Sequence, residues 1–187
     1  MIALDTAGLL YLHDPTTKAE QDPATGLPVT DAQARVQQFV SELHGRRERI
    51  LIPTPALAEF LQIATEEGPN IYARLERSAA FKIEAFDSRA AIELAIITAK
   101  AKAGGDVRAG SIASMAKIKF DRQIVAICKV HRVRALFTSD KNLTAFARAN
   151  GVTVIAIWDL PLPPKPPQMS FWETVKDEAV ESQDAKR

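Results

Sequence analysis

Short runs of apolar residues alternate along the chain with longer segments in which apolar residues recur every three or four positions. The short runs are too brief for helices and predict five strands, at Ile2 to Leu4, Ile50 to Ile52, Phe81 to Ala85, Ala135 to Phe137 and Val152 to Ile157. The longer segments predict helices, at Ala7 to Leu12, Asp31 to Leu43, Pro55 to Thr65, Ile71 to Arg77, Ser88 to Ala101, Arg122 to His131 and Leu143 to Ala149. This alternation is typical of a parallel sheet wrapped by crossover helices, so we predict an α/β fold.

Helix start signals and two irregular stretches refine this outline. Asp87 and Asp121 each stand directly before a predicted helix, where an aspartate can cap the first turn. The stretch from His13 to Pro28 is rich in Asp, Pro, Thr and Gly, which predicts an exposed loop after the first helix. We expect one domain over residues 1–158, followed by a proline-rich C-terminal tail over residues 159–187.

Composition narrows the class of protein. A chain of 187 residues suits one domain with one buried core. Lysine plus arginine (24) nearly balances aspartate plus glutamate (23), so any attraction to a nucleic acid must come from local patches. The single cysteine, Cys128, cannot form an intramolecular disulfide, and Asp5 stands where a signal peptide would need basic and then apolar residues. We therefore expect a cytoplasmic protein that does not enter a membrane.

Four acidic residues flank the predicted strands at what should be one edge of the sheet. Asp5 follows the first strand, and Asp140 follows the fourth. Glu59 lies about one turn into the helix after the second strand, and Asp121 opens the helix that leads into the fourth. Converging carboxylates repel one another unless a cation lies between them, and oxygen ligands suit Mg²⁺ or Mn²⁺. Each acid also has a structural interpretation, as a helix cap, a turn residue or part of a polar helix face.

The four acids lie in segments that resemble, in the same order, the motifs of the PIN-domain nucleases. The segments are Leu4-Asp5-Thr6, Pro53-Thr54-Pro55-Ala56-Leu57-Ala58-Glu59-Phe60, Phe120-Asp121-Arg122-Gln123-Ile124-Val125-Ala126 and Leu136-Phe137-Thr138-Ser139-Asp140. The resemblance covers about residues 1–158. The chain departs from the family pattern in its longer loop after the first helix, in Arg122 and Gln123 after the third acid, and in its proline-rich tail.

The resemblance implies a three-layer α/β/α domain with a five-stranded parallel sheet. It also implies metal-dependent hydrolysis of phosphodiester bonds, usually in RNA, with Mg²⁺ or Mn²⁺ as the cofactor. Asp5, Glu59, Asp121 and Asp140 become the expected metal-binding and catalytic residues. Many bacterial members are VapC-like toxins that an antitoxin neutralises, so an antitoxin partner and a homodimer are also expected.

Two hydroxyl residues and a basic stretch complete the expected site. Thr6 and Thr138 match supporting hydroxyl groups of the family, although local turn or capping hydrogen bonds explain both equally well. The basic residues expected to contact RNA are Lys102, Arg108, Lys117, Lys119 and Arg122. A solvated loop explains any one of these lysines as well. Two other interpretations stay open: a PIN nuclease of RNA processing that is not a toxin, and an interaction module that keeps the fold without catalysis.

Overall fold

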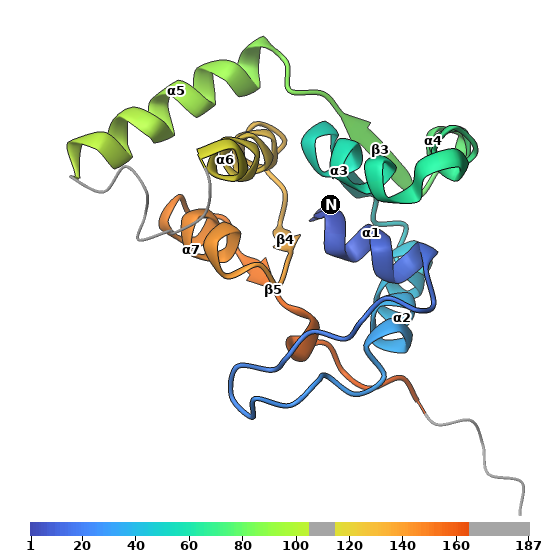
Figure 1. Ribbon diagram of the computed structural model, residues 1–187. Helices are drawn as coiled ribbons and strands as arrows, with labels where there is room; N and C mark the ends of the chain where they lie inside the picture. Colours follow the sequence, from blue (N-terminus) through green and yellow to red (C-terminus); the bar gives the residue numbers. More distant parts are fainter. Residues whose placement is uncertain (105–114, 165–187) are drawn as a thin grey trace, which may run out of the picture.

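A parallel sheet forms the centre of the protein (Figure 1). The computed structural model describes residues 1–104 and 115–164. Its strands are β1 (Ile2–Leu4), β2 (Ile50–Pro53), β3 (Phe81–Glu84), β4 (Ala135–Phe137) and β5 (Val154–Ile155), all paired in parallel in the order β3-β2-β1-β4-β5. The predicted five-stranded sheet is confirmed. Its last strand is shorter than expected because the chain turns into a 3-10 helix, η2, at Ile157–Asp159.

Seven helices of the described residues connect these strands. They are α1 (Thr6–His13), α2 (Ala32–Gly45), α3 (Thr54–Ala64), α4 (Gly68–Arg77), α5 (Ser88–Ala103), α6 (Met115–Val130) and α7 (Lys141–Ala149), with a 3-10 turn, η1 (Thr65–Glu67), before α4. The predicted cap of α5 is confirmed, since the Asp87 side chain accepts a hydrogen bond from the Ala90 amide. The predicted start of the next helix is wrong. Asp121 lies inside α6, which already includes Met115, and does not cap it.

The sheet separates two apolar cores, which makes the domain three-layered as expected. Side chains alternate between the faces of a strand. In β1, Ile2 and Leu4 therefore pack into the core that α1 and α2 cover, whereas Ala3 packs into the core that α5, α6 and α7 cover. Figure 1 shows α6 and α7 on one side of β4 and β5, with α1 and α2 on the other.

The packed part of the chain continues past the expected boundary at residue 158. Leu160 is 4% exposed and belongs to the core beneath α1 and α2. The guanidinium of Arg35 donates a hydrogen bond to the carbonyl oxygen of Leu160. Most of the expected tail, residues 165–187, lies outside the described residues. None of the helices in residues 1–104 and 115–164 has the length and hydropathy that a membrane span requires.

Candidate active site

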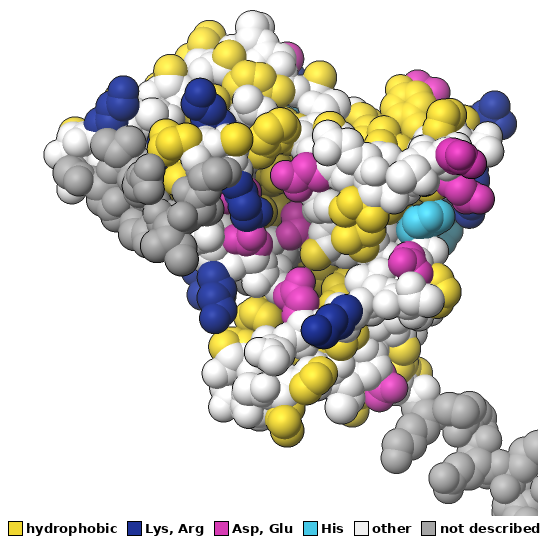
Figure 2. Space-filling view, viewed as in Figure 1, with side chains coloured by type: hydrophobic (Ala, Val, Ile, Leu, Met, Phe, Trp, Pro, Cys, Tyr) yellow, Lys and Arg dark blue, Asp and Glu magenta, His cyan; other side chains and the backbone are white. Residues whose placement is uncertain are grey.

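A hollow of about 260 Å³ opens at the carboxyl edge of the sheet and carries a concentration of acidic side chains (Figure 2). All four acids singled out in the sequence line it, together with one that the sequence did not indicate. These five, the acid hollow, are Asp5, Glu20, Glu59, Asp121 and Asp140. In the strand order, the chain reverses its direction of travel across the sheet between β1 and β4, which is where open α/β sheets bind ligands.

Asp5 lies at the floor of the acid hollow and is 5% exposed. Its carboxylate accepts a hydrogen bond from the Gly8 amide at 3.0 Å, so it also caps α1. A Cβ atom at Gly8 would lie 3.0 Å from Cδ1 of Phe137, so glycine lets α1 start this close to the sheet. Burial raises the pKa of Asp5 to about 7, against the opposing effect of a hydrogen bond with the Thr138 hydroxyl.

Glu59 comes from α3 and is held by a residue of α1. Oγ1 of Thr6 donates a hydrogen bond to Oε2 of Glu59 at 2.7 Å. Thr6 is the first residue of α1, directly after Asp5, so one short segment both supplies an acid and orients another. The two threonines expected to support the acids do contact them, Thr6 at Glu59 and Thr138 at Asp5.

Asp121 and Asp140 face each other across the ammonium group of Lys117. The Lys117 Nζ atom lies 2.8 Å from Oδ2 of Asp140 and 3.6 Å from Oδ1 of Asp121. Burial raises the pKa of Asp121 to about 6, although Lys117 acts in the opposite direction. Burial acts on Asp140 as well, but Lys117 and the amides of Leu143 and Asn142 outweigh it and hold its pKa below the usual value. Asp140 thus combines a helix-capping role with a place in the acid hollow.

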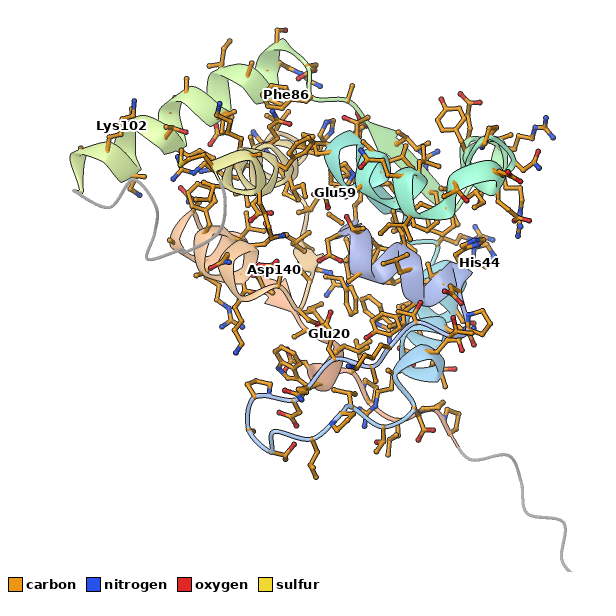
Figure 3. The ribbon with its side chains drawn as sticks, viewed as in Figure 1. Glu20, His44, Glu59, Phe86, Lys102 and Asp140 are labelled. Atoms are coloured by element: carbon orange, nitrogen blue, oxygen red, sulfur yellow. The ribbon has the colours of Figure 1, made fainter. Side chains whose placement is uncertain are left out.

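Glu20 is the residue that the sequence analysis missed. It belongs to the loop of residues 14–31 between α1 and α2, and its half-buried side chain points toward the space that Asp140 and Glu59 also face (Figure 3). Burial raises its pKa, while the Ser139 hydroxyl lowers it and the charge of Asp140 raises it further. No periodicity marks a loop residue of this kind, so only the position of the loop in the fold reveals it.

The donor set of the acid hollow suits a hard divalent cation. Carboxylate and hydroxyl oxygens line it, with neither histidine nor cysteine among the lining residues. Within residues 1–104 and 115–164, no three His, Cys, Asp or Glu side chains stand close enough together to hold one ion. Among the described lining residues, the cationic group next to the acids is the ammonium of Lys117. A divalent ion therefore fits the chemistry of the site, provided that the carboxylates close around it and Lys117 gives way.

The basic residues expected to contact RNA occupy different environments. Lys119 on α6 is exposed. Lys102, near the end of α5, is exposed as well (Figure 3). Lys117 lies in the acid hollow, and Arg108 falls outside the described residues. Arg122 is only 6% exposed, with its guanidinium 5.0 Å from the centre of the Phe146 ring. Arg122, which was expected to contact RNA, is therefore packed in the interior of the domain, because α6 turns this residue toward α7.

The fold is similar to that of solved VapBC structures. One is VapBC2 from Rickettsia felis bound to a DNA fragment from their promoter, with a TM-score of 0.53, 14% identity, and coverage of 83% of this chain and 98% of that chain. Another is DNA-bound VapBC from Salmonella typhimurium, with a TM-score of 0.51, 16% identity, and coverage of 83% and 97%. The chain has the VapC-like PIN fold. No protein-family model matches the sequence, and neither does any curated protein.

The PIN fold explains why residues far apart in the sequence meet in the acid hollow. Asp5 and Asp140 end the adjacent parallel strands β1 and β4, whose carboxyl ends lie at one edge of the sheet. Glu59 and Asp121 lie on α3 and α6, which pack against each other. The expected order of strands and acids is thus present in three dimensions, while the likeness to the VapBC chains concerns the fold alone.

Proposed function

We propose that this protein is a Mg²⁺- or Mn²⁺-dependent ribonuclease and the toxin of a toxin–antitoxin pair. The observation that carries the proposal is the meeting of Asp5, Glu59, Asp121 and Asp140 in one hollow at the switch point of a PIN fold. These four carboxylates would hold the ion. The VapBC structures support the toxin assignment through the shared fold.

The side chains around the acid hollow have different roles in the proposed phosphodiester hydrolysis. A bound divalent ion would supply an activated water and neutralise charge that develops on the phosphate. Thr6 orients Glu59, and Thr138 opposes the rise in the pKa of Asp5 that burial causes. Lys117, now paired with Asp121 and Asp140, can neutralise a phosphate group that enters the hollow.

The substrate and partner follow from the same proposal. The exposed Lys119 belongs to α6, the helix that also carries Asp121, and would contact the RNA backbone at the outer surface of this helix. Lys102 on α5, the neighbouring helix, would extend this contact. An antitoxin that binds the protein, a homodimer and a cytoplasmic location belong to the proposal on the strength of the PIN resemblance.

Cleavage of a panel of single-stranded and structured RNAs tests the proposal. Wild type, Asp5→Asn and Asp121→Asn are compared with Mg²⁺, Mn²⁺ or EDTA. Asp87→Asn is the matched control for Asp5→Asn, because both aspartates cap a helix through the amide three residues on, but Asp87 lies outside the acid hollow. We expect metal-dependent cleavage by wild type and the control only. No cleavage by folded, antitoxin-free, Mn²⁺-loaded wild type would favour the interaction module.

A further inference from the structure

The loop of residues 14–31, which the sequence marks only as an insertion, is a folded element. Gln21 and Pro28 form an antiparallel bridge. The amide of Val29 donates to the Glu20 carbonyl at 2.8 Å, and the amide of Gly26 donates to the Asp22 carbonyl at 2.7 Å. Gly26 has a φ of 71°, which glycine adopts without strain. These bonds form a small hairpin that fixes the course of the backbone next to Glu20.

A buried tyrosine of α1 fastens the start of this hairpin. Tyr11 is 1% exposed, and its hydroxyl accepts a hydrogen bond from the Glu20 amide at 3.1 Å. The same hydroxyl donates to the Lys18 carbonyl at 3.2 Å. Both hydrogen-bonding functions of one core residue thus hold the backbone on either side of Ala19. The position of Glu20 is built into the fold.

The side chain of Glu20 lines the acid hollow. There it interacts with the hydroxyl of Ser139, which itself accepts a hydrogen bond from the Ile157 amide at 3.2 Å. Ser139 directly precedes Asp140, so Glu20 is tied to the strand end that supplies the fourth acid. Glu20 lines the same hollow as Asp5 and Asp140, and half-buried negative charges that share one space are stabilised when a cation binds between them.

We propose that Glu20 is a fifth carboxylate ligand of the divalent ion and that the residue 14–31 loop serves to deliver it. The inference rests on the proposed function, because it assigns one more ligand to the same metal site. Carboxylate oxygens suit Mg²⁺ and Mn²⁺, and the Tyr11 anchor supplies the preorganised position that a ligand needs. A role limited to holding the loop through Ser139 would need only a hydrogen-bonding side chain, without charge.

Mn²⁺ binding to the RNA-free full chain, measured by titration calorimetry, separates these roles. Glu20→Gln keeps the shape and the hydrogen-bonding capacity but removes the charge. Asp22→Asn is the matched control, because Asp22 lies in the same hairpin and its side chain only accepts a bond from the Ala24 amide. We expect Glu20→Gln to weaken Mn²⁺ binding by about tenfold or more, and Asp22→Asn to leave it within about twofold.

Equal Mn²⁺ affinity in Glu20→Gln and wild type would overturn the inference and leave the metal site intact. Absence of Mn²⁺ binding by wild type would overturn both the inference and the proposed function. Tryptic cleavage after the exposed Lys18 gives a second readout on wild type itself, independent of how the variant folds. Saturating Mn²⁺ should slow this cleavage, because the ion fixes the hairpin through Glu20. An unchanged cleavage rate would count against Glu20 as a ligand.

Discussion

The ammonium group of Lys117 joins Asp140 at 2.8 Å and Asp121 at 3.6 Å, so one cation of the chain links two acids from different elements. Asp121 lies one helical turn after Lys117 on α6, and Asp140 caps α7. The attraction of Asp140, Asp121 and Glu59 raises the pKa of Lys117, although partial burial acts in the opposite direction. Lys117 therefore stays charged at neutral pH and acts as the counter-ion of the acid hollow.

Removing the ammonium group of Lys117 should favour the binding of a divalent cation in the acid hollow. We expect Lys117→Met to bind Mn²⁺ about threefold to tenfold more tightly near pH 8, since the entering ion no longer displaces an ammonium from a partly exposed ion pair. Lys119→Met is the control, because Lys119 is exposed and does not line the acid hollow. Calorimetric titration measures both. Weaker or unchanged binding by Lys117→Met would show that Lys117 does not compete with the ion.

The stability of the metal-free protein should fall as the pH rises. Folding raises the pKa of Asp5 from 3.8 to about 7 and that of Asp121 to about 6. The folded state therefore favours their protonated forms, and this contribution is fully present below pH 3.8 and is lost as the pH rises through about 6 to about 7. In EDTA, we expect the free energy of unfolding to drop by on the order of 2 to 3 kcal/mol from Asp5 alone between about pH 5 and pH 8.

Urea denaturation at several pH values measures this effect. Asp140 does not contribute to it, because its pKa is lowered and it is ionised throughout this range. Asp5→Asn keeps the helix cap but cannot titrate, so its stability should vary less with pH than that of wild type. If wild type and Asp5→Asn lost the same stability over this range, Asp5 would not have the raised pKa.

The hydrogen bond from Thr6 to Glu59 should matter more for catalysis than for stability. Thr6→Val removes the 2.7 Å bond and leaves Glu59 free to change rotamer. We expect RNA cleavage to fall by about tenfold to a hundredfold, with a loss of stability of about 1 kcal/mol. Thr6→Ser keeps the hydroxyl and should retain most of the activity. Equal losses in Thr6→Ser and Thr6→Val would show that the hydroxyl is not what matters.

Substitution of Arg122 should affect the stability of the protein, whereas substitution of Lys119 should affect RNA binding. Arg122→Ala removes a buried side chain packed on Phe146, so it should destabilise the protein by about 1 to 4 kcal/mol without changing the RNA affinity of the folded form. Lys119→Ala should leave stability unchanged but weaken RNA binding and lower its salt dependence by about one counter-ion. Filter binding in an Asp121→Asn background measures the RNA affinity of both variants, and urea denaturation measures their stability. A reduced salt dependence in Arg122→Ala would place its charge at the RNA.

The strand ends were the part of the site that the sequence could predict. A strand that is buried on both faces gives a continuous apolar run, and the polar residues that follow it mark the edge of the sheet. Asp5 comes directly after β1, and Asp140 follows β4 after Thr138 and Ser139. The structural interpretation of Asp5 as a cap is confirmed by its bond from the Gly8 amide. Asp140, interpreted as a turn residue paired with Asn142, accepts the expected bond from the Asn142 amide and also caps α7. Capping and a place in the site do not exclude each other here.

The environments of Asp121 and Glu20 could not be predicted in this way. Asp121 looked like a cap because the helical period is clear only after it. In the structure, α6 already includes Met115, so Asp121 lies in the middle of the helix, where its side chain is buried. Glu20 depends on bonds from Tyr11 and Val29 that join residues across a loop. Such tertiary hydrogen bonds leave no periodic trace in a sequence, so the contribution of a loop to a site appears only in the folded chain.

The insertion of β4 beside β1 governs when the acid hollow can first exist during synthesis on the ribosome. A growing chain carries Asp5 and Glu59 early, but β1 has no neighbour on its β4 side until Ala135–Phe137 has been made. Asp140 follows only after that strand, and Lys117 is made before it. A nascent chain that still lacks β4 therefore cannot bring Asp140 beside Asp5, so the acid hollow is completed only late in synthesis, after residue 140 has been made.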